Sequence, residues 1–164
     1  SRLLIFSKHC YAFEPIPDRA VRLSQTLNKS RVTIVEKALS SRVGLSTLRI
    51  PVVDQKRFDG RATIEPSNPV DQSITHSISV EVATLDSIEL PSIGFIKIDV
   101  EGHELDVLLG GMHLLERDRP SILIEAEERH KPGAVCDVRN LLEPLGYRGF
   151  FLLDGVLHSI DTFD

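Results

Sequence analysis

The feature that most constrains the fold is a strand–helix–strand pattern compressed into residues 10–35. Cys10–Phe13 is a nearly continuous apolar run, typical of a strand buried on both faces. Pro17 suits the first turn of a helix, and apolar residues then recur at helical spacing as far as Leu27. Val32–Val35 is β-branched throughout. Two strands joined by a helix in so short a segment predict parallel pairing and an α/β fold.

The second half of the chain repeats the alternation of strand and helix. Phe95–Val100 is predicted as a central strand, and the apolar residues after it fall on one helical stripe that reaches Leu115. Ser121–Glu125 is predicted as another buried strand, with a covering helix that ends near Pro144.

The last unit is predicted to be an antiparallel hairpin. Its strands run from Tyr147 to Leu153 and from Val156 to Ile160, around Asp154-Gly155. This dipeptide suits a type I′ turn, in which both central residues need positive φ. The expected fold is therefore a mostly parallel α/β sheet that ends in an antiparallel hairpin.

Length and composition predict one soluble domain over residues 1–164, with a loop-rich insertion at 46–75. A strand at Leu45–Ile50 is the alternative for the first part of this segment. Nineteen basic against 24 acidic residues give a net charge of −5, which argues against nucleic acid as a partner. The sequence has no apolar run long enough for a membrane span and no signal peptide pattern, so a cytoplasmic location is expected.

Acidic residues stand where three of the parallel strands should end. They are Glu14, Asp99 and Glu125. Because the carboxyl ends of parallel strands meet at one edge, where such sheets bind ligands, these side chains are expected to gather there. A carboxylate in the position of Glu14 can accept hydrogen bonds from both hydroxyls of a ribose. A solvated acid or a helix N-cap partner would explain an acid at this position equally well. The acidic run from Glu125 to His130 is otherwise interpreted as a charged loop.

The segment from Asp99 to Glu104 is the best candidate site because it is dense in titratable groups between a strand and a helix. Asp99 closes an apolar strand, where a carboxylate is costly without a partner, and this favours a functional role. His103 could be a general base, although an exposed histidine at a helix start is commoner. Glu104 is expected to cap the helix. A hard-cation site built on these oxygens is a third alternative.

Several separated blocks of the sequence resemble the FkbM-type methyltransferases that depend on S-adenosylmethionine. The most specific is the Lys97–Glu104 block with Gly110-Gly111 after it. Four other blocks also carry the resemblance. In chain order they are Tyr11–Pro15, Ala38–Ser40 with Gly44, Thr84–Ser87, and Arg119-Pro120 leading to Glu125.

The resemblance implies a Rossmann-like class I methyltransferase fold with S-adenosyl-L-methionine as cofactor. By it, Glu14 holds the cofactor ribose, Ala38 lies by the adenine, and Asp99 lies near the methionine part and the acceptor. Asp99, Glu101 and His103 become the candidate catalytic residues, and no metal is implied. The implied reaction is methylation of a hydroxyl oxygen on a small molecule or a sugar.

One departure from the family pattern stands out. The sequence has no glycine before Gly44, whereas the family carries a first strand and a glycine-rich cofactor loop ahead of the strand that ends in Glu14. The expected fold is therefore N-terminally truncated, and this chain is expected to bind the cofactor poorly. The alternative hypothesis is a non-catalytic methyltransferase-like remnant that serves as an interaction domain.

Overall fold

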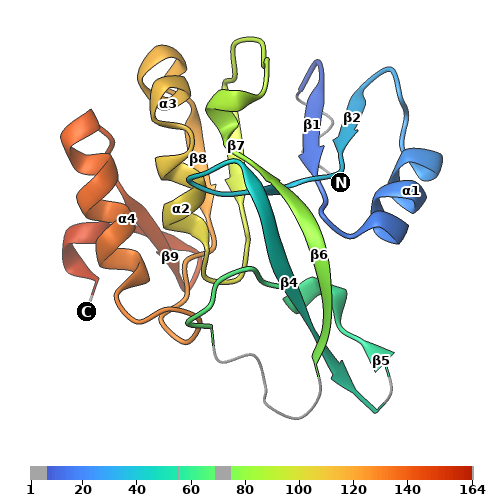
Figure 1. Ribbon diagram of the computed structural model, residues 1–164. Helices are drawn as coiled ribbons and strands as arrows, with labels where there is room; N and C mark the ends of the chain where they lie inside the picture. Colours follow the sequence, from blue (N-terminus) through green and yellow to red (C-terminus); the bar gives the residue numbers. More distant parts are fainter. Residues whose placement is uncertain (1–6, 55, 69–74, 164) are drawn as a thin grey trace.

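The structure is a computed structural model that describes residues 7–54, 56–68 and 75–163 (Figure 1). Short 3-10 turns, at 59–61, 85–87, 143–145 and 160–162, connect some of the longer elements. The helices and strands are, in chain order, β1 (Cys10–Phe13), α1 (Pro17–Thr26), β2 (Val32–Val35), β3 (Ala38–Leu39), β4 (Gly44–Val53), β5 (Lys56–Arg57), β6 (Thr75–Ala83), β7 (Phe95–Ile98), α2 (Glu104–Leu109), α3 (Met112–Asp118), β8 (Ser121–Ile124), α4 (Ala134–Leu142), β9 (Phe150–Leu153) and β10 (Val156–Ser159).

The first three elements form the predicted strand–helix–strand unit. Strands β1 and β2 pair in parallel, with Cys10 opposite Val32 and Phe13 opposite Val35. Helix α1 begins at Pro17, whose fixed φ suits a first helical position. It buries Ala20, and Ile16 just before it is 1% exposed. The sequence pattern is confirmed here because each element is specified by its own residues.

Strands β7 and β8 form a second parallel pair, but the helix between them is not continuous. The predicted stripe is divided between α2 and α3 at Gly110-Gly111. A Cβ at Gly110 would overlap the backbone carbonyl of Ser40, and one at Gly111 would come within 2.8 Å of the Leu85 side chain. Both glycines therefore allow a close approach of neighbouring loops, and the helix is interrupted where that approach occurs.

Much of the segment expected to be loop-rich is strand. Residues 46–53 belong to β4. This strand pairs antiparallel with β6 over eight residues, from Gly44 opposite Val82 to Pro51 opposite Thr75. Leu48 and Ile50 alternate with more exposed neighbours and are 3% and 0% exposed, so one face of β4 is in the core. With β3 and β5 these strands form a mixed sheet in the order β3-β6-β4-β5 among the described residues. Residues 69–74 of the expected insertion lie outside the described residues.

The C-terminal hairpin is confirmed. Strand β9 pairs antiparallel with β10, and Asp154 and Gly155 between them have φ of 50° and 78°, as a type I′ turn requires. In the part of the chain that the structure describes, the hairpin is not hydrogen-bonded to the parallel strands. The expected single sheet that ends in this hairpin is therefore divided into smaller sheets.

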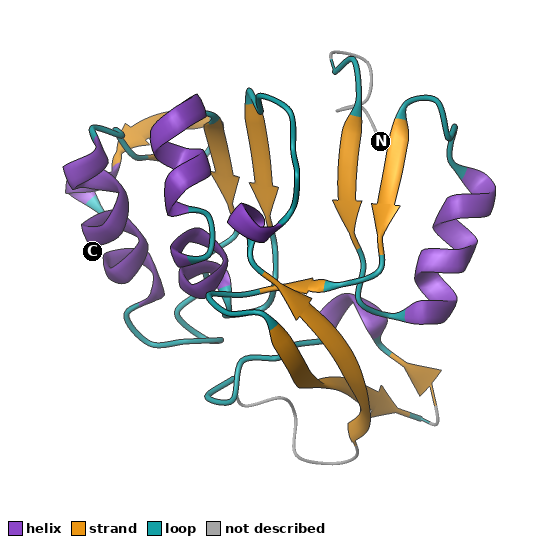
Figure 2. Cartoon of the chain, turned by 45° about the horizontal axis from the view of Figure 1, so that its top comes forward, coloured by secondary structure: helices purple, strands orange, loops and turns teal. Residues whose placement is uncertain are grey.

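Two hydrophobic clusters hold these sheets together. One joins Ile16 and Ala38 to the inner faces of β4 and β6. The other is centred on Ile98 and Leu108, and Phe13 of β1 and Ile124 of β8 pack against it. The ends of β1, β7 and β8 therefore share one core, and Figure 2 shows the arrowheads of β1, β2, β7 and β8 pointing the same way.

None of the helices in the described residues has the length and apolar character needed to span a lipid bilayer.

Candidate functional site

The predicted acids Glu14, Asp99 and Glu125 lie at one rim of the molecule. Each directly follows a residue of the same hydrophobic cluster, namely the last residue of β1, β7 or β8. The strands run in the same direction in Figure 2. The backbone N–H of Glu125 donates to the carbonyl of Ile98 at 3.0 Å, which ties the ends of β8 and β7 together. This rim is where parallel α/β sheets bind ligands.

Glu14 is engaged by the start of α1. Its Oε1 accepts the backbone N–H of Ile16 at 3.0 Å, and its Oε2 lies 3.2 Å from Nε of Arg19. The side chain is 13% exposed. The helix-start role that the sequence left open is therefore present, and each carboxylate oxygen keeps a second lone pair for another donor.

Asp99 is more exposed than expected for a carboxylate that closes an apolar strand. Its side chain is 37% exposed, and Oδ2 lies 2.5 Å from Nζ of Lys97, two residues earlier in β7. Alternate residues of a strand project from the same face, so the sequence itself brings this ammonium beside the carboxylate. The desolvation argument for Asp99 was therefore wrong. What remains is an accessible carboxylate directly after β7, which pairs with β8 alone among the described residues and is not the central strand that was expected.

The turn from Asp99 to Glu104 is held by the buried Glu104 carboxylate. Glu104 is 1% exposed, and its Oε1 accepts the N–H of Gly102 at 3.0 Å and that of Val100 at 3.4 Å. Glu101 and Gly102 have φ of 54° and 99°, a left-handed bend that leaves these N–H groups pointing inward. Glu104 lies in the first turn of α2, as expected, but its carboxylate binds N–H groups of the preceding turn and does not cap the helix.

Glu101 faces a histidine that was assigned to a charged loop. Nε2 of His130 lies 3.1 Å from its Oε2, and both side chains are less than 20% exposed. Burial raises the pKa of the Glu101 carboxyl above its usual value; His130 opposes this rise, while the nearby Asp99 and Glu127 carboxylates add to it. The backbone carbonyl of Glu101 accepts hydrogen bonds from Thr63 Oγ1 at 2.9 Å and Asn68 Nδ2 at 2.6 Å. Two side chains of the segment between β5 and β6 are therefore hydrogen-bonded to the turn that contains Glu101.

His103 is buried, in contrast to the exposed helix-start histidine that was the commoner expectation. Nδ1 lies 3.1 Å from Oε2 of Glu65, and Nε2 lies 2.8 Å from Oγ of Ser40. All three residues are less than 10% exposed. The structure thus forms a Ser–His–Glu chain from three segments that are far apart in sequence.

Glu65 is the residue that sequence reasoning missed. It follows a polar stretch with no periodic pattern, and no local signal connects it with His103. Burial opposes ionisation of Glu65, but hydrogen bonds from Ser67 and His103 and the charge of Lys131 bring its pKa below the usual value. Glu65, His103 and Asp106 place ligand atoms within 4.8 Å of one another, a spacing that a cation could use. The Lys131 ammonium 3.8 Å from Oε2 of Glu65 opposes a cation there.

The four residues considered for a hard cation do not converge on one point. Asp99 pairs with Lys97, Glu101 with His130, and His103 with Glu65, while Glu104 faces backbone N–H groups. The structure brings together Ser40, Glu65 and His103 instead.

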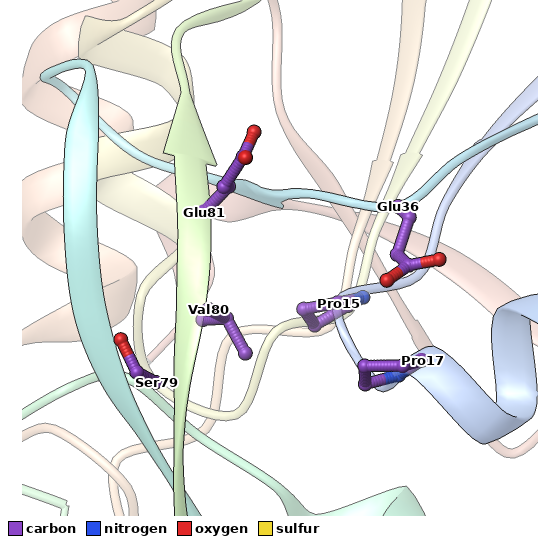
Figure 3. A pocket seen from close by; sticks show the side chains of 6 residues that line it. All are labelled: Pro15, Pro17, Glu36, Ser79, Val80 and Glu81. Atoms are coloured by element: carbon purple, nitrogen blue, oxygen red, sulfur yellow. The ribbon is translucent and has the colours of Figure 1, made fainter.

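An open hollow of about 350 Å³ is bordered by Pro15, the residue after Glu14 (Figure 3). Pro15 and Pro17 border it from the segment after β1, Glu36 from the end of β2, and Ser79 to Glu81 from β6. Ala38 is 7% exposed and packs in the same cluster as Val80, which also lines the hollow. The Glu81 carboxylate pairs with Lys37 at 2.7 Å, and this contact lowers its pKa. The hollow therefore has acidic groups on two sides.

A family profile described as the methyltransferase FkbM domain matches residues 5–148. This chain belongs to the FkbM methyltransferase family. The match spans β1 through α4 and includes every residue of the rim described above. The resemblance that rests on the Lys97–Glu104 block is thereby confirmed.

The chain is also similar to two known methyltransferases. Hexuronic acid methyltransferase AglP of Haloferax volcanii is 33% identical over 116 residues, which is 65% of this chain and 42% of that protein. The crystal structure of methyltransferase FkbM from Methylobacillus flagellatus KT matches with a TM-score of 0.55 and 21% identity, over 91% of this chain and 34% of that one. The chain thus spans less than half the length of either relative, and the structural match concerns the fold alone.

Proposed function

We propose that this protein is a methyltransferase that uses S-adenosyl-L-methionine and methylates a hydroxyl oxygen of a sugar. The observation that carries the proposal is the shared rim: Glu14 and Asp99 follow strands whose last residues pack in one cluster, in a chain of the FkbM family. A ligand with separated polar groups could then contact both carboxylates.

The residues beside the hollow fit the nucleoside part of the cofactor. Glu14 would accept hydrogen bonds from the ribose hydroxyls through its remaining lone pairs, as its position at the end of β1 allows. Ala38 would border the adenine through the cluster it shares with Val80. Asp99 would face the cationic part, where a half-exposed carboxylate favours positive charge.

When bound, the cofactor supplies an electrophilic methyl group on a sulfonium. The contribution of this chain is to hold the acceptor oxygen in line with that methyl and to receive the proton of the hydroxyl. Correct positioning alone can account for several kcal/mol of a barrier, up to about 7–11. Asp99, Glu101 and His103 are the proposed catalytic groups because all three stand in the turn that follows β7.

The acceptor class follows from the named relative and from the site. AglP is named as a hexuronic acid methyltransferase. A uronic acid offers hydroxyls for methylation and a carboxylate for recognition by a cation. We therefore propose a sugar, with uronic acids first among the candidates.

Two measurements test the proposed function. Isothermal titration calorimetry with S-adenosylmethionine should give weak binding, as expected for a chain without the glycine-rich loop, and binding at least tenfold weaker still in Glu14→Gln, because a neutral amide replaces a charged acceptor. Asp99→Asn should lose methyl transfer to a sugar hydroxyl and keep the wild-type circular dichroism spectrum. Glu116→Gln, an exposed acid on α3, is the matched control. An Asp99→Asn protein with full activity would contradict the catalytic role.

A second candidate, a non-catalytic interaction domain, is favoured by one observation. Strands β1 and β7 lie side by side in both views, yet within the described residues they share no hydrogen-bonded pairing (Figures 1 and 2). Unpaired strand edges can accept a further strand. The calorimetry decides between the candidates, since an interaction domain would show no binding of S-adenosylmethionine even at millimolar concentration.

A further inference from the structure

A buried polar chain joins Ser40, His103 and Glu65 beside a small pocket. The pocket has a volume of about 100 Å³ and is lined by Ser40 and His103 together with Arg42, Gly44, Ile64 and Pro66, among others. It is separate from the hollow bordered by Pro15, with which it shares no lining residue. The polar chain therefore has one end at an accessible site.

The contacts of His103 define its proton positions. A carboxylate only accepts hydrogen bonds, so Nδ1, 3.1 Å from Glu65 Oε2, carries the hydrogen in the neutral imidazole. Nε2 is then the free base, and it accepts the hydroxyl hydrogen of Ser40 at 2.8 Å. The order of donors leads from Ser40 through His103 to Glu65. This is the arrangement in which a histidine receives a proton by way of a hydroxyl.

Hydrogen bonds and packing fix both ends of the Ser40–His103–Glu65 chain. The backbone N–H of Ser40 donates to the carbonyl of Ala83 at 2.9 Å, and Gly110 packs directly against the Ser40 carbonyl. Glu65 accepts two hydrogen bonds from Ser67, at 2.7 Å from the hydroxyl and 3.1 Å from the backbone N–H. Such preorganisation is what a catalytic proton path requires, since little rearrangement accompanies the transfer.

Arg42 gives the pocket a cation. It is exposed, and within the described part of the chain its guanidinium has no hydrogen bond or ion pair. A guanidinium without an internal partner can bind a carboxylate through two parallel hydrogen bonds. The pocket therefore combines a group that recognises an acid with a group that accepts a proton from a hydroxyl.

We propose that this pocket holds the acceptor as a sugar acid, with Arg42 on its carboxylate and the Ser40–His103–Glu65 chain taking the proton of the methylated hydroxyl. The inference rests on the proposed function and adds to it the acceptor pocket, its specificity residue and its proton path. Ser40 and Arg42 contact the acceptor, and Glu65 is a positioning residue that acts through His103.

The chemical step balances without a further reactant. The acceptor oxygen forms a bond to the methyl carbon, the carbon–sulfur bond breaks, and its electron pair goes to sulfur. The proton of the acceptor hydroxyl passes to Ser40 Oγ while the Ser40 proton passes to Nε2 of His103. The resulting imidazolium faces the Glu65 carboxylate, with Asp106 3.8 Å from the same ring nitrogen.

The specificity part is tested with p-nitrophenyl β-glucuronide and the neutral p-nitrophenyl β-glucoside as acceptors. Arg42→Gln should raise KM for the glucuronide by about 10- to 100-fold, the value of a charged hydrogen bond, and leave the glucoside unchanged. Arg148→Gln, an exposed arginine near the hairpin, is the matched control and should change neither value. Equal KM values of Arg42→Gln and wild type for the glucuronide would overturn the specificity assignment.

The proton path is tested by Ser40→Ala, His103→Gln and Glu65→Gln. The first two should lower kcat by about 100-fold or more, as expected for loss of general base catalysis. Glu65→Gln should also move the acid limb of the rate profile to lower pH, because the imidazolium loses its negative neighbour, while Asp106, Arg42 and Lys131, which pairs with Glu65 in the wild type, remain. A purely structural role would lower the rate equally at all pH values.

Nuclear magnetic resonance gives a readout that does not depend on turnover. Long-range ¹H–¹⁵N spectra should show His103 with hydrogen on Nδ1 in the wild type and a mixture of tautomers in Glu65→Gln. An unchanged tautomer and rate in Glu65→Gln would overturn the proton path. If calorimetry shows cofactor binding but the wild type methylates neither acceptor, this inference fails and the proposed cofactor stands.

Discussion

Replacing the buried Glu104 by alanine should destabilise the protein more than replacing an exposed acid of α2 or α3 by alanine. Glu104 is 1% exposed, and its Oε1 accepts the N–H groups of Gly102 and Val100 at 3.0 and 3.4 Å. The alanine variant leaves these buried donors without an acceptor, and the left-handed residue Glu101 loses the contacts that fix the bend on either side of it.

The magnitude follows from these two contacts. A hydrogen bond to a charged acceptor contributes about 1.5–3 kcal/mol. Counting the 3.0 Å contact in full and the 3.4 Å contact as weak, we expect the free energy of unfolding to fall by about 3 kcal/mol. For a chain of this length that corresponds to a Tm lower by about 6–12 °C. Glu104→Gln keeps an acceptor oxygen and should lose only about 1 kcal/mol.

Urea denaturation followed by circular dichroism measures both variants. Glu116→Ala, on the exposed side of α3, is the control and should unfold at the wild-type urea concentration. The reasoning is refuted if Glu104→Ala and Glu116→Ala unfold at the same midpoint. It is also refuted if Glu104→Gln is as unstable as Glu104→Ala, because the carboxylate would then act only by filling space.

Three further predictions concern packing and charge. Gly110→Ala should lower the free energy of unfolding by about 1–3 kcal/mol, since a Cβ would overlap a backbone carbonyl, whereas Gly60→Ala meets nothing within 4 Å and should be neutral in the same urea experiment. A neighbouring guanidinium, with a backbone N–H, lowers the pKa of Asp118 from 3.8 to about 2, so this carboxylate stabilises the fold above about pH 4 and loses that effect as the pH falls toward 2. Asp118→Asn should flatten the fall of the urea midpoint over that pH range; an unchanged slope would contradict the prediction. His130→Ala should raise the pKa of Glu101 further in a ¹³C carboxyl titration, because the side chain that opposes the rise is removed, and a lower pKa would refute the pairing.

Local sequence determined the elements whose residues all lie close together in the chain. Parallel β1 and β2 and the hairpin around Asp154-Gly155 follow from patterns that extend over fewer than thirty residues. In each case the burial preference and the backbone preference of the same residues agree. The shared rim was also predictable, since parallel strands place their carboxyl ends on one side.

Where the prediction failed, distant segments decided the outcome. The stripe that should have been one helix is interrupted at Gly110-Gly111, because the carbonyl of Ser40 and the side chain of Leu85 approach there. The strand that the sequence left open at Leu45–Ile50 extends over Gly44–Val53, because β6 pairs with residues 44–51 and β5 with residues 52–53. A hydrophobic pattern gives the preference of a segment, but it does not reveal which partner comes into contact.

The sequence by itself determined the family, the parallel strand pairs and the acids that follow them. Only the tertiary structure brought Ser40 and Glu65 to the two ring nitrogens of His103, across 63 and 38 residues of chain. The physical reason is that a hydrogen bond acts over about 3 Å, whereas the separation of two residues in the chain does not fix their distance in space. Such a buried polar chain exists only once β3, the segment after β4 and the turn before α2 have packed together.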